Sequence, residues 1–491
     1  MIKQQRILII ALLAVFAVLL AAYFIVVRPL TAEEETTDAP VETEPDEGVA
    51  YDTELLMFPK IERSDMQSIE VHNEHGTYKF VYDSEFGDFE LEGHENLAFD
   101  ATLFSRLVVN TGFTLAIEKI TNKATEQELL DYGFKGDAPY YTLTTRGGKS
   151  YTVRIGEKII SGGGYYAMVD GREAIYILDA SLEMTVLAAV EEMVSPILTA
   201  GVEVTSYFKI DNFTIKHYGE DFLQCRNRSE EELGEMETTA LAESLAVYPA
   251  EYSLSTHYDD TLQMLCNYEG EAVAAIGLTD ENLEKFGLTD KPYSIHYEFD
   301  GFKFDLVASE PVDGYYYVST SIFDVIIKVP EADFSFLKYD LLYWVSPRAF
   351  SRNITFVSSI KIESDEVTET FNLSHHPNDD PNLVVIGDEC GQITDIPNFR
   401  ELYKDLLLVT IEDYAPEGVE PNEDNCVLKF TVTTKGGSVT EYAFYRYSTR
   451  RCLLTINGKG QFYVLMDMAQ KIMSDTSKVI AGQKINATDK S

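Results

Sequence analysis

The chain has 491 residues, of which 45% are apolar, so it is long enough to bury several hydrophobic cores. Its length alone suggests about three domains. It carries 39 basic and 82 acidic residues, which gives a formal net charge of −43. A polyanion of this size repels phosphate backbones, so nucleic acid is excluded as a partner.

Residues 1–30 are predicted to be a transmembrane anchor. Residues 7–27 form an unbroken run of 21 apolar residues, and as a helix at ~1.5 Å per residue this run would be about 31 Å long, enough to cross a bilayer core. The alternative is a cleaved signal peptide, but its apolar region is typically about 7 to 15 residues long and precedes a small-residue cleavage site, whereas Arg28 follows this run. Lys3 and Arg6 precede it, which favours a cytoplasmic N-terminus. We therefore expect a single-pass protein of the cell membrane with the bulk of its chain outside the cytoplasm.

Residues 31–59 are predicted to be an acidic, disordered linker. The segment contains no Lys or Arg, and its acidic residues are Glu33, Glu34, Glu35, Asp38, Glu42, Glu44, Asp46, Glu47, Asp52 and Glu54. Such a segment cannot bury enough apolar area to offset its ordering entropy, and its charges repel one another. A calcium site is not expected, because the 1-3-5 oxygen spacing with a central glycine is missing.

The first module is predicted to begin with an antiparallel pair, residues 68–73 and 77–82, whose apolar and polar residues alternate. His72 and His75 fall near the turn between them, and we interpret them as turn residues rather than metal ligands. Residues 99–109 have helical apolar spacing and predict a helix packed on the sheet. A hairpin over residues 140–155 turns at Gly147 and Gly148.

An internal repeat links this module to a second one. The segment from residue 126 to 196 has the same order of parts as residues 281–347: a lead-in to glycine, a hairpin, a Gly-Tyr-Tyr strand, a short apolar strand and a Val-Ser-Pro ending. The offsets are 154 residues between Gly133 and Gly287, 150 between Gly164 and Gly314, and 151 between Pro196 and Pro347. A period near 150 predicts domain-sized copies, each with its own core.

The remaining elements complete three modules. The second module is expected to open with a strand at 213–218 and to contain a Glu-rich helix around 229–246, with Trp344, the single tryptophan, in its core or against a neighbouring module. A weaker third copy covers residues 426–464, follows a strand at 357–362 and includes a helix over 398–408 with an asparagine cap. Residues after 476 are expected to form a frayed tail.

The predicted fold class is α+β, with repeated antiparallel-sheet modules and packed helices after one transmembrane helix. The predicted boundaries are 1–30 for the anchor, 31–59 for the linker, 60–200 for module 1, 201–350 for module 2, 351–475 for the divergent module 3 and 476–491 for a flexible tail. The chain has five cysteines, and none of them belongs to a C-x-x-C pair. We interpret them as small buried apolar residues, with a disulfide between two of them as the open alternative. They are Cys225, Cys266, Cys390, Cys426 and Cys452.

The order of a lead-in Tyr-Gly-Phe, a glycine-turned hairpin, a Gly-Tyr-Tyr strand and an Ile-Tyr-Ile strand resembles the bacterial family designated domain of unknown function 4340. The resemblance covers most of residues 60–350 and, more loosely, 351–475. It implies a protein anchored by one N-terminal helix and associated with an ATP-driven permease of the gliding-motility type. The family's motifs are structural, so the resemblance supplies no catalytic residue.

A search for chemistry finds no nucleophile elbow, no zinc-protease motif and no P-loop. The Gly162-Gly163-Gly164 run precedes a strand-like segment rather than a helix, so it predicts a turn rather than a phosphate-binding loop. No cofactor and no metal are expected. Three function classes stay open: a non-enzymatic accessory protein or scaffold for an ABC-type permease complex, which we favour, a surface binding or adhesion module for an extracellular polymer, and a hydrolase that uses carboxylates in a cleft between modules.

The candidate interface residues belong to the repeated aromatic strands. Successive side chains of a strand alternate faces, so one tyrosine of each pair should point away from its core. An outward tyrosine on a rigid strand is a good interface anchor, although it could equally pack against a neighbouring module. The candidates are Tyr165, Tyr166, Tyr315, Tyr316 and Tyr317.

Overall fold

The computed structural model describes residues 52–83, 87–94, 96–160, 162–199, 210–228, 244–299, 302–376, 379–387 and 395–485. The predicted transmembrane anchor and most of the predicted linker lie outside these ranges. Among the helices within them, none is long and apolar enough to cross a membrane. Every described helix and strand belongs to one compact unit that begins at Glu54.

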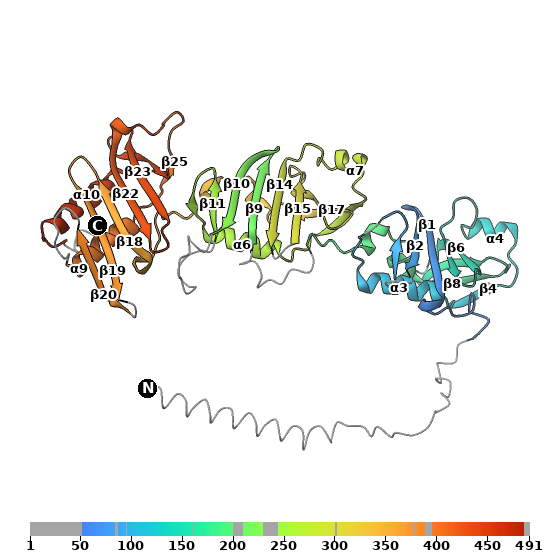
Figure 1. Ribbon diagram of the computed structural model, residues 1–491. Helices are drawn as coiled ribbons and strands as arrows, with labels where there is room; N and C mark the ends of the chain where they lie inside the picture. Colours follow the sequence, from blue (N-terminus) through green and yellow to red (C-terminus); the bar gives the residue numbers. More distant parts are fainter. Residues whose placement is uncertain are drawn as a thin grey trace, which may run out of the picture. The chain divides into compact units, whose positions relative to one another are not determined.

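Three antiparallel sheets dominate the structure (Figure 1). Sheet 1 has the strand order β3-β2-β1-β5-β6-β7-β8-β4, sheet 2 the order β12-β11-β10-β9-β14-β15-β16-β17-β13, and sheet 3 the order β20-β19-β18-β22-β23-β24-β25-β21. Apart from β12, which extends one edge of sheet 2, the same sequence of connections recurs three times. The predicted repeated antiparallel-sheet modules are therefore confirmed, and the third copy keeps the topology despite its divergent sequence.

The strand bounds of sheet 1 are β1 (Met66–Asn73), β2 (Gly76–Asp83), β3 (Asp88–Leu91), β4 (Glu118–Thr121), β5 (Tyr140–Thr145), β6 (Ser150–Lys158), β7 (Gly164–Val169) and β8 (Ile175–Asp179). Those of sheet 2 are β9 (Ile210–His217), β10 (Glu220–Asn227), β11 (Ser244–Tyr248), β12 (Tyr252–Ser253), β13 (Ala272–Ile276), β14 (Tyr293–Phe299), β15 (Phe302–Ala308), β16 (Tyr315–Thr320) and β17 (Val325–Pro330). Those of sheet 3 are β18 (Val357–Glu363), β19 (Thr368–His376), β20 (Asp379–Gly387), β21 (Asp413–Tyr414), β22 (Cys426–Thr434), β23 (Val439–Arg446), β24 (Arg451–Ile456) and β25 (Lys459–Leu465).

Few helices accompany the sheets, so the described chain is mainly β. One helix of 10 to 12 residues follows the third strand of each repeated order: α3 (Ala101–Gly112), α6 (Thr256–Leu265) and α9 (Ile396–Leu407). The other described α-helices are α4 (Glu126–Asp131), α7 (Asp280–Lys285), α8 (Leu341–Trp344) and α10 (Met466–Ile480). Short 3-10 helices lie at Arg63–Asp65, Ala180–Met184, Val190–Met193, Ser335–Lys338, Ile354–Phe356 and Glu423–Asn425.

Each core forms where a sheet's alternating apolar face meets its helix. In β1 the buried residues Ile69 and Val71 alternate with more exposed ones, as expected for a strand with one buried face. The Asp100 side chain caps α3 by accepting bonds from two backbone N–H groups of its first turn. Phe80 of β2 then packs edge-to-face on Phe104 of α3, with ring centroids 5.0 Å apart.

The cores of the three modules are not equally separate. Module 1 has its own cluster of buried apolar residues, including Ile69 and Leu107. Modules 2 and 3 share one continuous cluster, which includes Trp344 in module 2 and Phe462 in module 3 and also takes in Val194 and Leu198 from the end of module 1. Trp344 is fully buried, in agreement with its predicted placement in a core. Met193 of module 1, 151 residues earlier in the chain, is also fully buried.

The lead-in turn of the repeat is the same in modules 1 and 2. Thr125 and Thr279 cap α4 and α7, and each helix ends in a residue with φ −99° and ψ 9°. The next residues, Gly133 and Gly287, have φ of +80° and +69°, a left-handed conformation that glycine adopts without a steric penalty. The predicted equivalence of these two glycines is therefore confirmed in local structure.

The Val-Ser-Pro segments connect successive modules in the same way twice. The Ser195 N–H donates to Ala98 O in its own module, and Pro196 O accepts from Gly270 N in the next module. Likewise, the Ser346 N–H donates to Ser253 O, and Pro347 O accepts from Ile411 N. We call these two-sided backbone links connector 1 and connector 2; because backbone bonds fix both sides, each connector holds the modules in a defined register.

Four sequence predictions for individual segments need correction. The end of the predicted disordered linker is ordered, because Met57 and Phe58 are buried in the core of module 1. Residues 476–480 are not a frayed tail, because they belong to α10, where Thr476 and Val479 are buried against the core. The prediction of a helix around 229–246 is wrong for its last residues, because β11 begins at Ser244. Residues 229–243 lie outside the described ranges. Asn398 does not cap α9; it lies inside the helix, donates to Gln483 O and accepts from Ile485 N, which fastens the C-terminal segment.

The module boundaries stay predictions. Module 1 denotes residues 60–200, module 2 residues 201–350 and module 3 residues 351–475.

Candidate binding site

The candidate tyrosines do not form one surface. Tyr316 is fully buried in the core of module 2, and Tyr165 packs against the core of module 1 with its hydroxyl donating to Glu183 at 2.7 Å. Burial and this hydrogen bond raise the pKa of Tyr165 to about 12. Tyr315 lies beneath the ammonium of Lys328, 3.6 Å from its ring centroid.

The outward tyrosines are covered by their own modules. Tyr166 stacks on Tyr132, with ring centroids 4.1 Å apart, and Tyr317 packs on Phe286 at 4.8 Å. Tyr132 and Phe286 are the equivalent residues that end α4 and α7. The lead-in helices therefore cover these rings, an arrangement that neither of the two predicted placements described.

The same contacts correct the alignment of the repeated strands. In the β7–β8 ladder Tyr166 lies opposite Ile177, and in the β16–β17 ladder Tyr317 lies opposite Lys328. Tyr317 lies 151 residues after Tyr166, and Lys328 lies 151 residues after Ile177. The same offset separates Pro196 from Pro347. Gly164 therefore corresponds to Tyr315 rather than to Gly314, and the apparent 150-residue offset was a one-residue misalignment.

Exposed aromatic side chains are concentrated in module 2. Throughout the described ranges, every aromatic residue among the exposed large apolar side chains belongs to that module: Tyr218 at 60%, Tyr248 at 41%, Phe302 at 59% and Tyr339 at 43%. Their positions at turns and strand ends gave no periodic signal. They lie at different ends of the sheet, since Tyr218 follows β9 while Phe302 begins β15.

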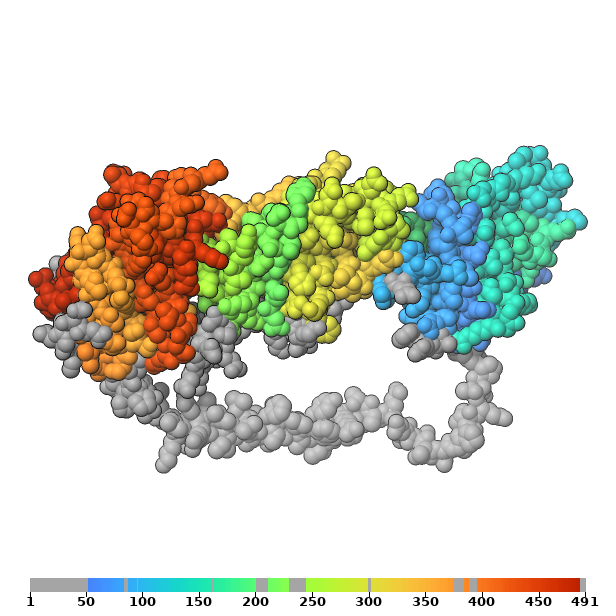
Figure 2. Space-filling model, turned by 45° about the horizontal axis from the view of Figure 1, so that its top comes forward, coloured from blue at the N-terminus to red at the C-terminus, as the bar shows by residue number. Residues whose placement is uncertain are grey.

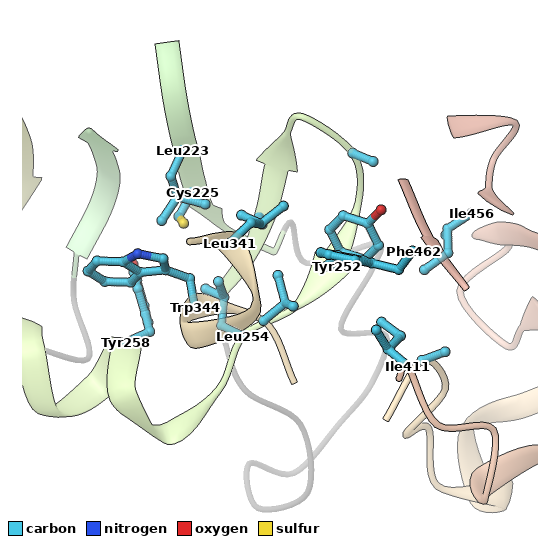
Figure 3. Close-up of a cluster of buried hydrophobic side chains, with 14 of the residues drawn as sticks. Leu223, Cys225, Tyr252, Leu254, Tyr258, Leu341, Trp344, Ile411, Ile456 and Phe462 are labelled. Carbon is cyan, nitrogen blue, oxygen red and sulfur yellow. The ribbon is translucent and has the colours of Figure 1, made fainter. Parts of the chain in front are cut away.

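The junction between modules 2 and 3 is built from aromatic and polar contacts. Tyr252 of β12 lies 5.1 Å from Phe462 of β25 between ring centroids, and its hydroxyl accepts from Gln461 N at 3.3 Å. Figure 3 shows Tyr252 directed toward Phe462 and Ile456. Asn457 donates to Glu251 at 2.7 Å, and the green surface of module 2 meets the red surface of module 3 here (Figure 2). Burial raises the pKa of Tyr252 to about 12.

A polar cavity of about 180 Å³ lies at this junction. Three segments far apart in sequence line it: the end of β10 with β12, the residues that follow connector 2, and the β23 and β24 turns. Its polar and charged lining residues are Arg228, Glu251, Tyr252, Ser253, Ser351, Arg352, Ser438, Thr440, Tyr442 and Asn457. We call it the junction cavity; Glu251, the acidic residue of this lining, accepts a hydrogen bond from Asn457.

A second depression adjoins the cavity at Ser351 and Arg352. This groove runs along α9 and has a volume of about 750 Å³. Its charged lining residues are Arg348, Arg352, Arg400, Glu401 and Lys404. Glu401 accepts from Lys404 at 2.6 Å. The cavity and groove together therefore contain five cationic and two acidic lining residues, whereas the whole chain has 39 and 82.

The field of the arginines reaches into the junction cavity. Burial raises the pKa of the Tyr442 hydroxyl, and the positive charges of Arg352 and Arg228 oppose that rise. Arg352 is only 8% exposed, and in such a setting a charge is screened less than at the surface. The Tyr442 hydroxyl therefore lies within reach of both arginines and of Glu251, whose negative charge acts in the opposite sense.

These arginines were not among the predicted site residues, although a comparison of the two connectors points to one of them. Connector 1 continues after Pro196 as Ile-Leu-Thr-Ala-Gly, whereas connector 2 continues after Pro347 as Arg-Ala-Phe-Ser-Arg. The two arginines are thus a difference between aligned copies. The other cavity residues come from separate segments, so no spacing along the chain connects them.

One depression of module 1 has a partly acidic lining, the kind of feature on which the hydrolase alternative depends. A depression of about 540 Å³ in module 1 is lined by Asp83, Asp88, Glu90 and His94 among others. Asp88 is paired with Arg63, and His94 Nδ1 lies 2.8 Å from Asp324 Oδ2 of module 2. Asp88 and His94 therefore each have a side-chain partner.

Histidines and cysteines form no cluster in the described residues. His72 is the second-last residue of β1 and does not lie in the turn; its Nδ1 is 2.6 Å from Thr77 Oγ1 and its Nε2 is 3.0 Å from Asp137 Oδ1. No group of three or more His, Cys, Asp or Glu residues within the described ranges could hold a metal ion. Four cysteines are free thiols, and three of these, Cys225, Cys266 and Cys452, are buried; Cys390 lies outside the described ranges.

No family model, curated protein or solved structure matches this chain. The resemblance to domain of unknown function 4340 stays a prediction.

Proposed function

We propose that this chain is a membrane-anchored, extracytoplasmic and non-enzymatic accessory protein that docks a permease complex of the ABC type in the same membrane. The observation that carries the proposal is the concentration of exposed aromatic side chains in module 2, because exposed tyrosine and phenylalanine are enriched among the residues that contribute most to protein interfaces. Modules 1 and 3 are fixed to module 2 by connectors of one design, which suits a scaffold that presents a central docking module.

Tethering supports this proposal through effective concentration. A predicted anchor at residues 7–27 would confine the modules to a layer beside the membrane, where a modest affinity for a membrane partner suffices. The net charge of −43 opposes adsorption to anionic lipid, so contact with the partner would depend on protein surface rather than on lipid.

The test is co-purification in mild detergent from a crosslinked membrane fraction, followed by mass spectrometry. We expect a multi-spanning permease subunit, and we expect deletion of residues 7–27 to reduce its recovery while the ectodomain keeps its circular dichroism spectrum. Alanine variants of Tyr218, Tyr248, Phe302 and Tyr339 should include at least one that lowers recovery tenfold or more. Tyr166→Ala serves as the matched control, because that ring is covered by Tyr132.

Two outcomes would overturn the proposal. Recovery of only wall or extracellular polymer components would favour the adhesion module instead. Equal permease recovery from all four aromatic variants would remove module 2 as the docking surface.

A further inference from the structure

We propose that a groove beside β3 in module 1 binds an extended segment of a partner protein, in which a Lys or Arg stands between two apolar residues. The groove is the depression of about 540 Å³ described above, lined by all four residues of β3, by Leu97 and Phe99, and by α3. We call it the β3 groove. The inference goes beyond docking through module 2 and does not depend on it, because the site lies in another module and is tested with the purified chain and synthetic peptides.

β3 is the outermost strand at one edge of sheet 1, and among the described strands it pairs with β2. The Glu92 N–H donates to Lys79 O at 2.8 Å, so the backbone groups of Phe89 and Leu91 face away from β2. Two of these outward groups have local partners: the Phe89 N–H donates to the carboxylate of the preceding residue, and Leu91 O accepts from the His94 N–H. The Phe89 carbonyl and the Leu91 N–H therefore stay as one acceptor and one donor for an added strand.

Module 2 shows how this edge is closed by a strand. β11 is the counterpart of β3, and β12 (Tyr252–Ser253) pairs with its outer edge. In module 1 the corresponding residues are Leu97 and Ala98, since Ala98 O and Ser253 O accept the equivalent bonds of connectors 1 and 2. Neither Leu97 nor Ala98 belongs to a strand, and Leu97 lines the β3 groove instead. The edge that module 2 closes with its own strand is therefore open in module 1.

The exposure pattern of β3 specifies the side chains of the added strand. Asp88 and Glu90 are exposed, whereas Phe89 and Leu91 are buried. Residues directly opposite each other in an antiparallel pair have their side chains on the same face, so the residues opposite Phe89 and Leu91 should be apolar and the one opposite Glu90 basic. Asp88 is paired with Arg63, whereas the described residues include no ion pair of Glu90. A Lys or Arg opposite Glu90 would supply one.

The floor of the β3 groove suits the two apolar side chains. Phe99 stacks on Phe104 with ring centroids 4.6 Å apart, and Phe89 lies 5.9 Å from Phe104. Apolar side chains that cover these rings would remove further apolar surface from water. The volume of about 540 Å³ lies within the roughly 300 to 1,000 Å³ of ligand pockets, so a short peptide segment has room.

Two other occupants match the groove less well. Residues 31–51 of the same chain contain no Lys or Arg, and like charges directly opposite each other on paired strands are destabilising. Two copies of a chain with a net charge of −43 repel each other. A separate protein with a basic residue in an apolar strand therefore fits the β3 groove better than either.

The test uses the purified full-length chain in neutral detergent and three fluorescein-labelled peptides with blocked ends. The first is Ser-Thr-Leu-Lys-Leu-Thr-Ser, the second has Glu in place of Lys, and the third has Ser in place of both Leu residues. Fluorescence polarisation should show that the first peptide binds about tenfold more tightly than either of the others, because it gains an attraction and covers the apolar floor. Its binding should also slow hydrogen exchange over residues 88–92, measured by mass spectrometry, since the Leu91 N–H would become hydrogen-bonded.

A charge reversal on β3 separates strand addition from general attraction to an acidic protein. Glu90→Lys should invert the preference, so that the peptide with Glu binds more tightly than the one with Lys; because Glu90 is exposed, the variant should fold normally. The matched control is Glu118→Lys, at an exposed glutamate of β4 on the opposite edge of sheet 1, which should leave the preference unchanged.

Three results would overturn the proposal. One is an unchanged peptide preference in Glu90→Lys, and another is peptide binding that leaves hydrogen exchange over residues 88–92 as it was. The third is a concentration-dependent dimer, seen by light scattering, that Glu90→Lys abolishes, because it would assign the β3 groove to a second copy of the chain.

Discussion

Connectors 1 and 2 share a backbone design but join their modules through different side chains. At connector 1 the half-buried pair of His94 and Asp324 joins the modules, Thr320 Oγ1 donates to Leu198 O at 3.0 Å, and the core of module 1 stays a separate apolar cluster. At connector 2 the apolar cluster runs without a break from Trp344 to Phe462. An exposed ion pair contributes about 0 to 1 kcal/mol, whereas a buried aromatic side chain contributes several times as much. Duplication has therefore kept one geometry and changed how strongly it couples the modules.

This difference predicts two unfolding units: module 1 by itself, and modules 2 and 3 together. The single tryptophan, Trp344, lies in the shared core, so its fluorescence reports the second unit, while circular dichroism reports both.

The largest effect is expected for Phe462→Ala in module 3. Its ring lies 5.1 Å from Tyr252 and 5.0 Å from Tyr414 between centroids, and truncation of a buried phenylalanine costs about 3 to 5 kcal/mol. Although Phe462 is in module 3, the loss should appear in the urea midpoint of Trp344 fluorescence in module 2. Phe302→Ala, the same change at a site 59% exposed, should alter stability by less than about 1 kcal/mol. An unchanged fluorescence midpoint in Phe462→Ala would separate modules 2 and 3.

A pH-dependent effect is expected for Asp405→Asn, which alters the contact between α9 and α10. Lys471 bridges Asp405 at 3.0 Å and Asp475 at 2.6 Å. Burial raises the pKa of Asp405 to about 6, so the folded state holds this proton more tightly than the unfolded state. The stability from proton binding is present below the unfolded pKa, near 3.9, and is lost as pH rises through about 6. Relative to Asp405→Asn, wild type should therefore lose about 1 to 3 kcal/mol between pH 4 and pH 7.

The measurement is urea unfolding at several pH values, compared between wild type and variant. Asp365→Asn, at an exposed aspartate in the turn after β18, is the control and should give a constant difference. A difference that stays constant for Asp405→Asn as well would contradict the raised pKa. Burial acts to raise the pKa of Asp475, but hydrogen bonds from Lys471 and Lys478 hold this pKa below its usual value. Asp475 should therefore remain charged over most of this range.

A smaller effect distinguishes the two lead-in glycines. An alanine in the left-handed conformation costs roughly 1 to 2 kcal/mol, and Gly287→Ala should show about this loss, since its added Cβ would come no closer than 3.7 Å to Ser309. At Gly133 the Cβ would lie 2.6 Å from Glu157 Cγ and 2.9 Å from its backbone N, so Gly133→Ala should cost more. Only Gly287→Ala should move the Trp344 midpoint, because Gly133 belongs to module 1. A fluorescence shift in Gly133→Ala would contradict the independence of module 1.

The repeat was predictable from sequence because its signals are local. The glycines after α4 and α7 and the Ser-Pro endings each act within a few residues, so they stand out at a constant offset. The covering of Tyr166 by Tyr132 was not predictable, because a residue 34 positions earlier in the chain provides the ring. The junction cavity was hidden for the same reason: residues 228, 251–253, 351–352 and 438–457 meet only after two modules have packed together.

The smallest effect is expected for His94→Ala at connector 1. Both side chains of the His94 and Asp324 pair are about one-third exposed, at 31% and 32%, so solvent screening limits its contribution to less than about 1 kcal/mol. Asp324 also accepts from Leu278 N at 2.8 Å, and this bond survives removal of the histidine. Asp324→Ala should therefore cost more than His94→Ala, and neither should approach the loss in Phe462→Ala. If His94→Ala moved the Trp344 midpoint by more than about 2 kcal/mol, connector 1 would couple its modules as strongly as connector 2, and the division into two unfolding units would fail.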